Sequence, residues 1–282
     1  MSREIFETQI IRVFRVGGLV VFFAAAAFPF YWMIVSSFKP LEELLLHPEN
    51  LGLDLRSLDF TSYRQVLLKH GFFRYIANSL YVSLMTVAVS VSLGTLGGYA
   101  VTRLRFPGKG IFSAGVLLVY MLPAIVLVVP LYVIFTHLGL RDSLHVLVLV
   151  YVAQTLPVSV YMLKNHFQAL PPEIEYAGMV DGCSRAGVIW RVVIPLSAPA
   201  LASVALYTFM IAWNEFLFAF MFLDTPDKFT LSRGIVQLAG SVHLSKQLVM
   251  AASVVVTVPV LILFLFFERQ LVRGLTAGAL KG

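Results

Sequence analysis

The stretch PPEIEYAGMVDGCSRAGVIWRVVIPLSAP, residues 171–199, interrupts a chain that is otherwise strongly apolar. Of its 282 residues, 59% are hydrophobic and only 13% are charged, and the mean hydropathy is +0.86. A soluble core does not need so much apolar surface, so the composition indicates a membrane protein. A semi-polar stretch bounded by prolines therefore indicates a unit that lies outside the membrane between two spans.

Two short helices are predicted in this unit. The pair Pro171–Pro172 suits a first helical turn, where a missing backbone N–H leaves no bond unmade. Glu173 and Glu175 are favourable near the positive end of the helix dipole. Gly182 can end this helix in a left-handed conformation, and Ser184 can cap the next helix. The expected result is a helix-turn-helix.

Each of these helices has an apolar face. In the first, Ile174, Ala177 and Gly178 follow the i, i+3, i+4 spacing and make a face of mostly small residues, which another surface can approach closely. Pro195 is expected to stop the second helix. The apolar face of that second helix is expected to contain four residues: Ala186, Ile189, Trp190 and Val193.

Six runs with few or no charges are long enough, at about 20 residues each, to cross a hydrocarbon layer as helices. Because a bilayer satisfies no backbone polar group, the spans should be helical. The prediction is an all-α membrane protein with one domain, residues 1–282, and a loop at residues 164–198 between the fourth and fifth spans. The six runs are residues 14–36, 75–101, 111–136, 143–163, 199–222 and 248–267.

Local features of the spans indicate close packing and bending. Gly94 and Gly98 have the spacing that lets two helices approach closely. Pro123 and Pro130 break hydrogen bonding in the third run, which gives either harmless kinks or the bends that let a pore flex.

The positions of basic residues indicate the orientation. With six spans, 12 of the 21 Lys and Arg residues fall on the side of both chain ends, residues 102–110 and residues 164–198. This side is predicted to be cytoplasmic. Topology therefore explains the net charge of +6, and no basic stripe indicates nucleic acid.

Of the two long outer loops, residues 37–74 and 223–247, the second is either a simple connection or a loop that touches cargo or a cargo carrier.

The opening stretch resembles a family signature. EYAGMVDG, nine residues and VVIP are similar to the cytoplasmic loop of the membrane subunits of binding-protein-dependent ATP-binding-cassette importers. In that family Glu-Ala-Ala, three residues, Gly, nine residues and Ile-x-Leu-Pro recur. The matching positions are Asp181, Gly182, Val192, Ile194 and Pro195.

One departure from the signature leaves a question open. Alignment on Gly182 places Tyr176 where the family's glutamate stands, with Glu175 one residue early. Ala177 then matches the first alanine of the signature, and Gly178 replaces the second. Which side chain makes the glutamate's usual contacts is left open.

The resemblance extends along the chain. SSFKP, NSL, YAVTRLRFPGK, AWNEFLFAF and LVRGLTAGALKG occur in an order that is similar to the shorter permease of maltose-type importers. The resemblance implies the fold of a type I importer permease, with the loop 164–198 as a coupling loop against an ATPase. It also implies that the glycine-rich tail, which includes Gly278, Lys281 and Gly282, reaches the ATPase interface.

Partners and location follow from the same resemblance. It implies a multi-pass protein of a bacterial or archaeal cytoplasmic membrane, in contact with lipid, with both termini cytoplasmic. The implied partners are a second permease, two ATPase subunits and an extracytoplasmic sugar-binding protein. The chain itself has no Gly-x-x-x-x-Gly-Lys-Ser/Thr sequence, so ATP and Mg²⁺ are expected only on the ATPases. The six histidines show no metal-ligand spacing, and no metal or cofactor is expected on this chain.

Residues 213–215 are candidates for a substrate pathway. Glu215 lies in an apolar run, where an ionisable group indicates function, although it could equally be a structural hydrogen-bond partner. Trp213 and Asn214 could stack on and hydrogen-bond a sugar, or Trp213 could be an interfacial anchor.

The expected cargo is a disaccharide or short oligosaccharide such as maltose or trehalose. One alternative is the same architecture with another small polar solute, such as glycerol phosphate. The other alternative is an intramembrane enzyme that uses Glu215 or His145, which would be active as an isolated chain and would leave the helix pair without a role.

Overall fold

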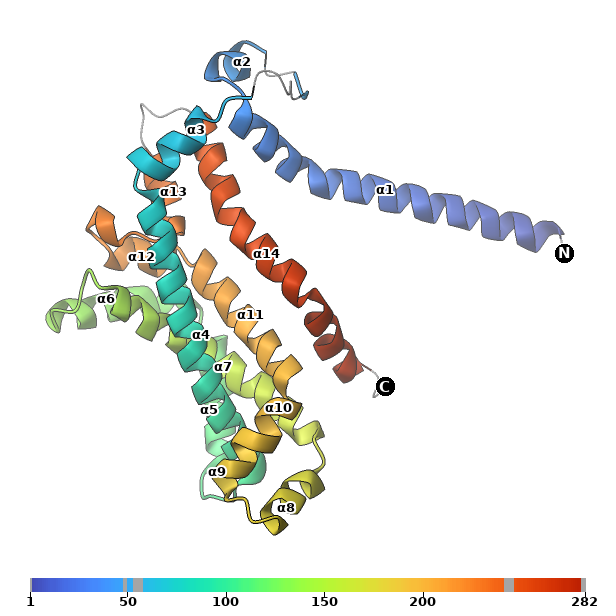
Figure 1. Ribbon diagram of the computed structural model, residues 1–282, viewed down its shortest axis with the longest axis vertical. Helices are drawn as coiled ribbons and strands as arrows, with labels where there is room; N and C mark the ends of the chain where they lie inside the picture. The colour runs from blue at the N-terminus through green and yellow to red at the C-terminus, as the bar shows by residue number, and fades with distance from the viewer. Residues whose placement is uncertain (1, 48–49, 53–57, 241–245, 280–282) are drawn as a thin grey trace. The chain divides into compact units, whose positions relative to one another are not determined.

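The computed structural model describes residues 2–47, 50–52, 58–240 and 246–279, and in these ranges the regular structure is helical, with no strand (Figure 1). The chain divides into two compact units. The first unit contains residues 1–70 and 237–255. The second unit contains residues 71–236 and 256–282.

The first unit begins with one long apolar helix, whose end is tied to the segment that follows. Ser37 and Tyr63 share a hydrogen bond of 2.6 Å between their hydroxyl oxygens. The buried ammonium of Lys39 donates to the backbone oxygen of Asn50 at 2.7 Å and pairs with Glu43 at 2.9 Å. The helices that start in this unit are α1 (Ser2–Phe38), α2 (Leu41–Leu46), α3 (Thr61–Arg64), the π-helical turn η1 (Gln65–Lys69) and α14 (Lys246–Ala279).

The second unit is built on three helices that pack along one another, α4, α7 and α11 (Figure 1). The helices that start in it are α4 (Phe72–Arg103), α5 (Lys109–Met121), α6 (Ala124–His137), α7 (Leu144–Ala169), α8 (Pro172–Val180), α9 (Arg185–Val188), η2 (Ile189–Val193), α10 (Ile194–Leu196), α11 (Ala198–Asn214), α12 (Leu217–Phe222), η3 (Pro226–Lys228) and α13 (Leu231–Ala239).

Two glycines set the distance between α4 and α7. A Cβ on Gly94 would lie 3.0 Å from the Cβ of Ser159, and a Cβ on Gly98 would lie 3.0 Å from the backbone nitrogen of Lys164. One turn before Gly94 in α4 the contact is polar, because Ser90 and Thr155 share a buried hydrogen bond of 2.8 Å. The small-residue spacing seen in the sequence therefore marks a place where backbones nearly touch.

The expectation of six spans is not confirmed as six single helices. Four helices of the described residues are long and apolar enough to cross a membrane, and a fifth span results if the helical segments 185–196 and 198–214, bent by 79°, are counted as one. Those four are Ile11–Phe38, Phe72–Arg103, Leu144–Ala169 and Lys246–Phe267.

Two predicted spans are broken for identifiable reasons. The run 111–136 divides into α5 and α6 at Leu122, which is extended (φ −73°, ψ 123°) because a residue before proline is forced out of the helical region. The run 199–222 divides into α11 and α12 at Glu215 and Phe216. The fourth span is longer than predicted, since α7 continues through residue 169 and takes up the first residues of the predicted loop 164–198.

We predict that Gly98→Ala destabilises the chain by about 1–3 kcal/mol, because the new methyl meets a backbone atom that cannot turn aside. Unfolding in detergent would measure the effect. Gly115→Ala in α5 is the matched control, since a Cβ there meets nothing within 4 Å. The control should be neutral or stabilising, by up to about 1 kcal/mol, from the better helix propensity of alanine. Equal effects of the two changes would contradict the close α4–α7 contact.

Candidate functional site

The helix pair predicted in the opening stretch is present. Helix α8 begins at Pro172, after an extended Pro171, and ends where Gly182 takes a positive φ of 88°. Beyond the turn, the backbone N–H of Cys183 donates to the oxygen of Gly178 at 3.0 Å and so satisfies a carbonyl at the helix end. Ser184 caps α9, because its hydroxyl accepts the N–H of Gly187 at 3.2 Å.

The second helix of the pair departs from the prediction. It runs from α9 through the π-helical turn η2 and ends with α10 at Leu196, one residue beyond the expected stop. Pro195 has no N–H to give to the helix ladder, and the chain accommodates this with the wider turn before the proline. The sharp change of direction, 79°, comes after Leu196, where α11 begins.

The wider turn also changes which residues face the core. Val188 and Val193 are buried with Phe167 of α7 and Val204 of α11 in one apolar cluster. The predicted apolar face is therefore wrong in part, since Ala186 and Trp190 are exposed and Ile189 is half-buried. A helix with one extra residue in a turn does not keep the i, i+3, i+4 register on which the prediction depended.

The outer face of the helix pair carries large apolar side chains. Tyr176 is 61% exposed, Val180 86% and Trp190 70%. The first two belong to α8 and Trp190 to η2, at the end of the unit that Figure 1 shows farthest from α12 and α13. Exposed aromatic and aliphatic side chains on a short polar unit are typical of a surface that another protein covers.

Glu175 is buried, whereas the neighbouring Tyr176 is exposed. The carboxylate of Glu175 is buried, accepts the hydroxyl of Tyr99 at 2.8 Å and pairs with the Nε of Arg103 at 2.6 Å. Arg103 also donates to the backbone oxygen of Leu170 at 2.7 Å. Glu175 is thus engaged within its own chain and fixes α8 to the end of α4, while Tyr176 is the surface residue. Sequence reasoning missed the role of Arg103, which it treated only as a topology signal.

The other predicted residues of the signature loop lie around these two. Ala177 and Asp181 are exposed, and Gly178 is half-buried, with its Cβ position 3.4 Å from a side-chain carbon of Val188. Gly178 therefore marks the contact between α8 and α9, as its small size suggests.

Glu215 lies in the break between α11 and α12. Its carboxylate accepts the hydroxyl of Tyr151 at 2.6 Å and the backbone N–H groups of Phe218 and Ala219 at 3.0 and 3.3 Å. Its backbone oxygen accepts the hydroxyl of Ser232 at 2.5 Å. The carboxylate thus caps the first turn of α12 and joins it to α7, which is the structural role that the sequence left open as an alternative.

The two residues before Glu215 differ sharply in exposure. Trp213 is fully buried, donates its indole N–H to the backbone oxygen of Val256 at 3.2 Å and stacks on Phe209. Its ring therefore presents no surface to a sugar or to a membrane interface in this conformation. Asn214 is exposed and donates to the backbone oxygen of Met210 at 2.9 Å.

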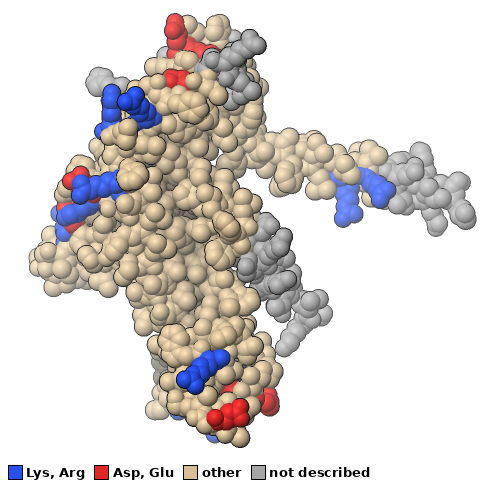
Figure 2. All heavy atoms as spheres, viewed as in Figure 1, with Lys and Arg blue, Asp and Glu red and all other residues tan. Residues whose placement is uncertain are grey.

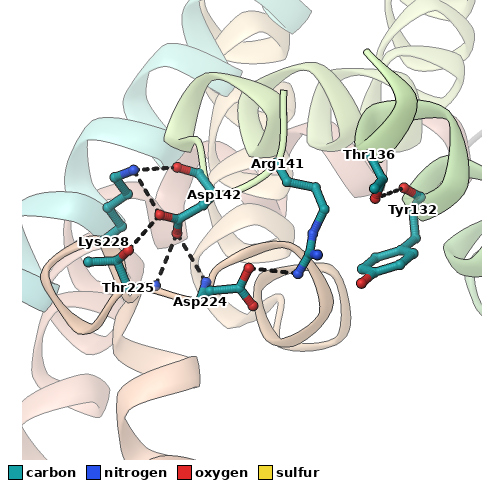
Figure 3. A network of polar contacts seen from close by, with 7 residues as sticks. All are labelled: Tyr132, Thr136, Arg141, Asp142, Asp224, Thr225 and Lys228. Atoms are coloured by element: carbon teal, nitrogen blue, oxygen red, sulfur yellow. Dashed lines mark hydrogen bonds and ion pairs between the residues drawn. The ribbon is translucent and has the colours of Figure 1, made fainter. Parts of the chain in front are cut away.

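A polar cluster that sequence reasoning missed joins the α6–α7 loop to the segment after α12 (Figure 3). Asp142, with a positive φ of 55°, accepts the N–H groups of Asp224 and Thr225 at 3.0 and 3.1 Å. Its carboxylate also accepts the hydroxyl of Thr225 at 2.6 Å and pairs with Lys228 at 2.8 Å. Burial raises the pKa of Asp142, but the hydrogen bonds from Lys228, Thr225 and the backbone outweigh burial and hold this pKa well below its usual range.

Comparison with known proteins places the chain in a family. Residues 90–277 match the binding-protein-dependent transport system inner membrane component family. The chain belongs to this family. The inner membrane ABC transporter permease protein YcjP of Escherichia coli (strain K12) is 41% identical over 95% of this chain and 97% of its own length. The trehalose/maltose transport system permease protein MalG of Thermococcus litoralis is 38% identical over 98% of this chain and 99% of its own length.

A solved structure shows the same fold. A chain of a bacterial ABC transporter involved in the import of the acidic polysaccharide alginate has a TM-score of 0.80 at 22% identity, over 93% of this chain and 96% of the other. Because the family and its similar members are permease components of transporters, this permease is a transport subunit and not an enzyme.

Some predicted residues of the permease lie where the structure says little or nothing. Lys281 and Gly282 lie outside the described residues, and Gly278 belongs to α14, at a point where no side chains are described. His145 is exposed, with its ring 5.9 Å from that of Tyr81. In the part of the chain that the structure describes, no three His, Cys, Asp or Glu residues come together as a metal site.

We predict that Glu175→Gln, which keeps the shape but removes the charge, destabilises the permease by about 1.5–3 kcal/mol, because the half-buried Arg103 loses its carboxylate partner. The free energy of unfolding of Glu175→Gln, Arg103→Gln and the double variant would measure it. The loss of stability in the double variant should be smaller than the sum of the two single losses by about 1 kcal/mol or more. Glu173→Gln is the control, since Glu173 is exposed on the same helix, and should change stability by less than about 0.5 kcal/mol. Additive losses would contradict the pairing.

We predict that Asp142→Asn destabilises the permease by about 1–3 kcal/mol at pH 7, because asparagine tolerates the positive φ but loses the charge that faces Lys228. The folded pKa is lowered, so the stabilisation is present above the unfolded pKa of about 3.9 and is lost as the pH falls toward the folded pKa. The stability difference between wild type and variant should therefore stay constant from pH 7 to about 5 and shrink below about pH 4. A difference that disappears near pH 6 would contradict the assignment.

Proposed function

We propose that this chain is a permease subunit of an ATP-driven, binding-protein-dependent sugar importer. It forms half of a translocation pathway with a second permease and couples through α8 to α10 to two cytoplasmic ATPase subunits. The cargo is a disaccharide or short oligosaccharide such as maltose or trehalose, as the name of the Thermococcus relative supports.

One observation carries the proposal. The helix pair exposes the apolar side chains of Tyr176, Val180 and Trp190, and Glu175 and Arg103 fix it to the spans. A unit attached in this way transmits a displacement of its exposed surface to the membrane-spanning helices. In the importer this displacement is caused by the ATPases, which close when they bind ATP.

The fold supports a six-span arrangement in the membrane. We count α5 with α6 and α11 with α12 as two broken spans, which together with the four long apolar helices gives six. The residues 1–282 then form one permease domain in a bacterial or archaeal cytoplasmic membrane, with both termini and the coupling loop in the cytoplasm. Gly278, Lys281 and Gly282 of the tail serve the ATPase interface.

Each subunit of the importer has its own chemical role. The ATPases bind ATP and Mg²⁺, this chain binds no cofactor, and an extracytoplasmic binding protein selects and delivers the sugar. Because Trp213 is buried and Glu215 caps α12, sugar contact by this chain falls to exposed groups such as Asn214. The same architecture with a cargo such as glycerol phosphate is the second candidate, which the choice of sugars below tests.

We predict that Gly182→Trp uncouples the importer. A bulky residue at a positive φ in the turn between α8 and α9 distorts the surface that docks on the ATPase. In the reconstituted complex, maltose or trehalose with the binding protein should stimulate ATP turnover by the wild type, and the variant should lose this stimulation or fail to retain its ATPases.

Gly139→Trp is the matched control for this experiment. Gly139 also has a positive φ, 66°, and open space around its Cβ position, but it lies in the loop between α6 and α7. The control should keep its stimulation. Equal loss in both variants would show that backbone strain and not ATPase docking is responsible, and normal coupling by Gly182→Trp would overturn the proposed role of the helix pair.

A further inference from the structure

Four basic side chains gather at the end of the second unit that carries α12, η3 and the start of α13. In Figure 2, blue and red atoms intermix at this level, whereas the helical middle of the unit is tan. Three of the four have carboxylate partners: Arg74 with Asp227 at 2.9 Å, Arg141 with Asp224 at 2.6 Å and Lys228 with Asp142 at 2.8 Å. Arg233 has no carboxylate within pairing distance among the described residues.

The guanidinium of Arg233 is held in place by aromatic rings. Its central carbon lies 4.4 Å from the ring centroid of Phe220 and 4.5 Å from that of Phe229. These contacts orient the group and use its π surface, but they use none of its five N–H donors, which lie in its plane. A planar fork fixed in this way is suited to two parallel hydrogen bonds with a carboxylate.

The backbone on both sides of Arg233 is anchored. The N–H of Leu231 donates to the hydroxyl of Ser79 at 2.8 Å, and Ser232 bonds the backbone of Glu215. On the other side, Gly234 packs so tightly on Tyr75 that a Cβ there would overlap the ring. The position of the guanidinium is therefore set before any partner arrives, which lowers the entropy lost on binding.

The charge of Arg233 is poorly compensated within the chain. Arg233 lies in the first turn of α13, where the helix dipole disfavours a cation. Its Nε is buried and has no hydrogen-bond partner among the described residues. Burial lowers the pKa of Arg233, although Asp224 opposes this effect. An anion from outside the chain that pairs with the terminal nitrogens of the guanidinium would balance this charge, while the buried Nε stays out of its reach.

We propose that Arg233 receives an acidic side chain of the extracytoplasmic binding protein. This inference rests on the proposed function, which supplies that partner. A protein surface fits the site better than a free anion, because the neighbouring basic groups Arg74 and Arg141 are already paired with Asp227 and Asp224, which leaves a small anion only Arg233 to bind. A protein can add contacts to the surrounding surface while its acidic residue reaches Arg233.

The test measures binding of the binding protein to the full complex in lipid nanodiscs, directly and without ATP. Arg233→Gln should raise the dissociation constant about tenfold, which corresponds to about 1.4 kcal/mol, and should weaken its dependence on salt. Arg233→Lys keeps the charge but not the fork, and should lie between wild type and Arg233→Gln. Arg74→Gln is the matched control, because it removes an exposed charge at the same end that already has a partner, and should change binding less than about twofold.

A second measurement separates this proposal from the proposed function. ATP turnover without binding protein, and maximal turnover at saturating binding protein with maltose or trehalose, should be the same for Arg233→Gln and wild type. Equal weakening of binding by Arg233→Gln and Arg74→Gln, or no weakening, overturns the role of Arg233. A defect that remains at saturating binding protein also overturns it, because it would place Arg233 in the transport step. If neither sugar stimulates ATP turnover of the wild type while binding still depends on Arg233, the result would count against the proposed cargo alone.

Discussion

The close approach of α4 and α7 at Gly94 and Gly98 is the constraint on which the rest of the second unit depends. Two backbones that nearly touch fix where each helix ends. The end of α4 therefore lies beside the end of α7, and Arg103 can reach both the last carbonyl region of α7 and the carboxylate of Glu175 in α8. Without that contact α8 would lose its ion pair with α4, and the apolar cluster around Val188 and Val193 would remain to hold the helix pair. With it, α8 is attached to two helices at once.

Breaks in apolar helices impose a second requirement, because a bilayer offers no water to the freed backbone groups. At the break after α11 the chain meets this requirement with Glu215, whose carboxylate takes two N–H groups of α12 and the hydroxyl of Tyr151. An acidic residue in an apolar run thus has a structural role at the start of a helix. The Asp142 cluster does the same for the segment that follows α12.

Sequence reasoning predicted the features that depend on local chemistry. The apolar runs, the interruption of the third run at Pro123, the left-handed Gly182 and the Ser184 cap each follow from one residue and its neighbours. It could not predict features that depend on distant partners. Nothing in the spacing of the signature loop shows that Glu175 turns inward to Arg103, and the extra residue in η2, which exposes Trp190, is visible only once the whole turn is built. The same holds for the burial of Trp213, which is decided by α14.

The turn between α8 and α9 contains the single cysteine of the chain. Cys183 is half-buried, and its backbone closes the end of α8 by a bond to Gly178. A thiol-reactive fluorophore or spin label would therefore attach to one position only, with no need to remove other cysteines from this chain. That position is the turn of the helix pair itself, so the natural sequence provides a spectroscopic reporter of the surroundings of this turn.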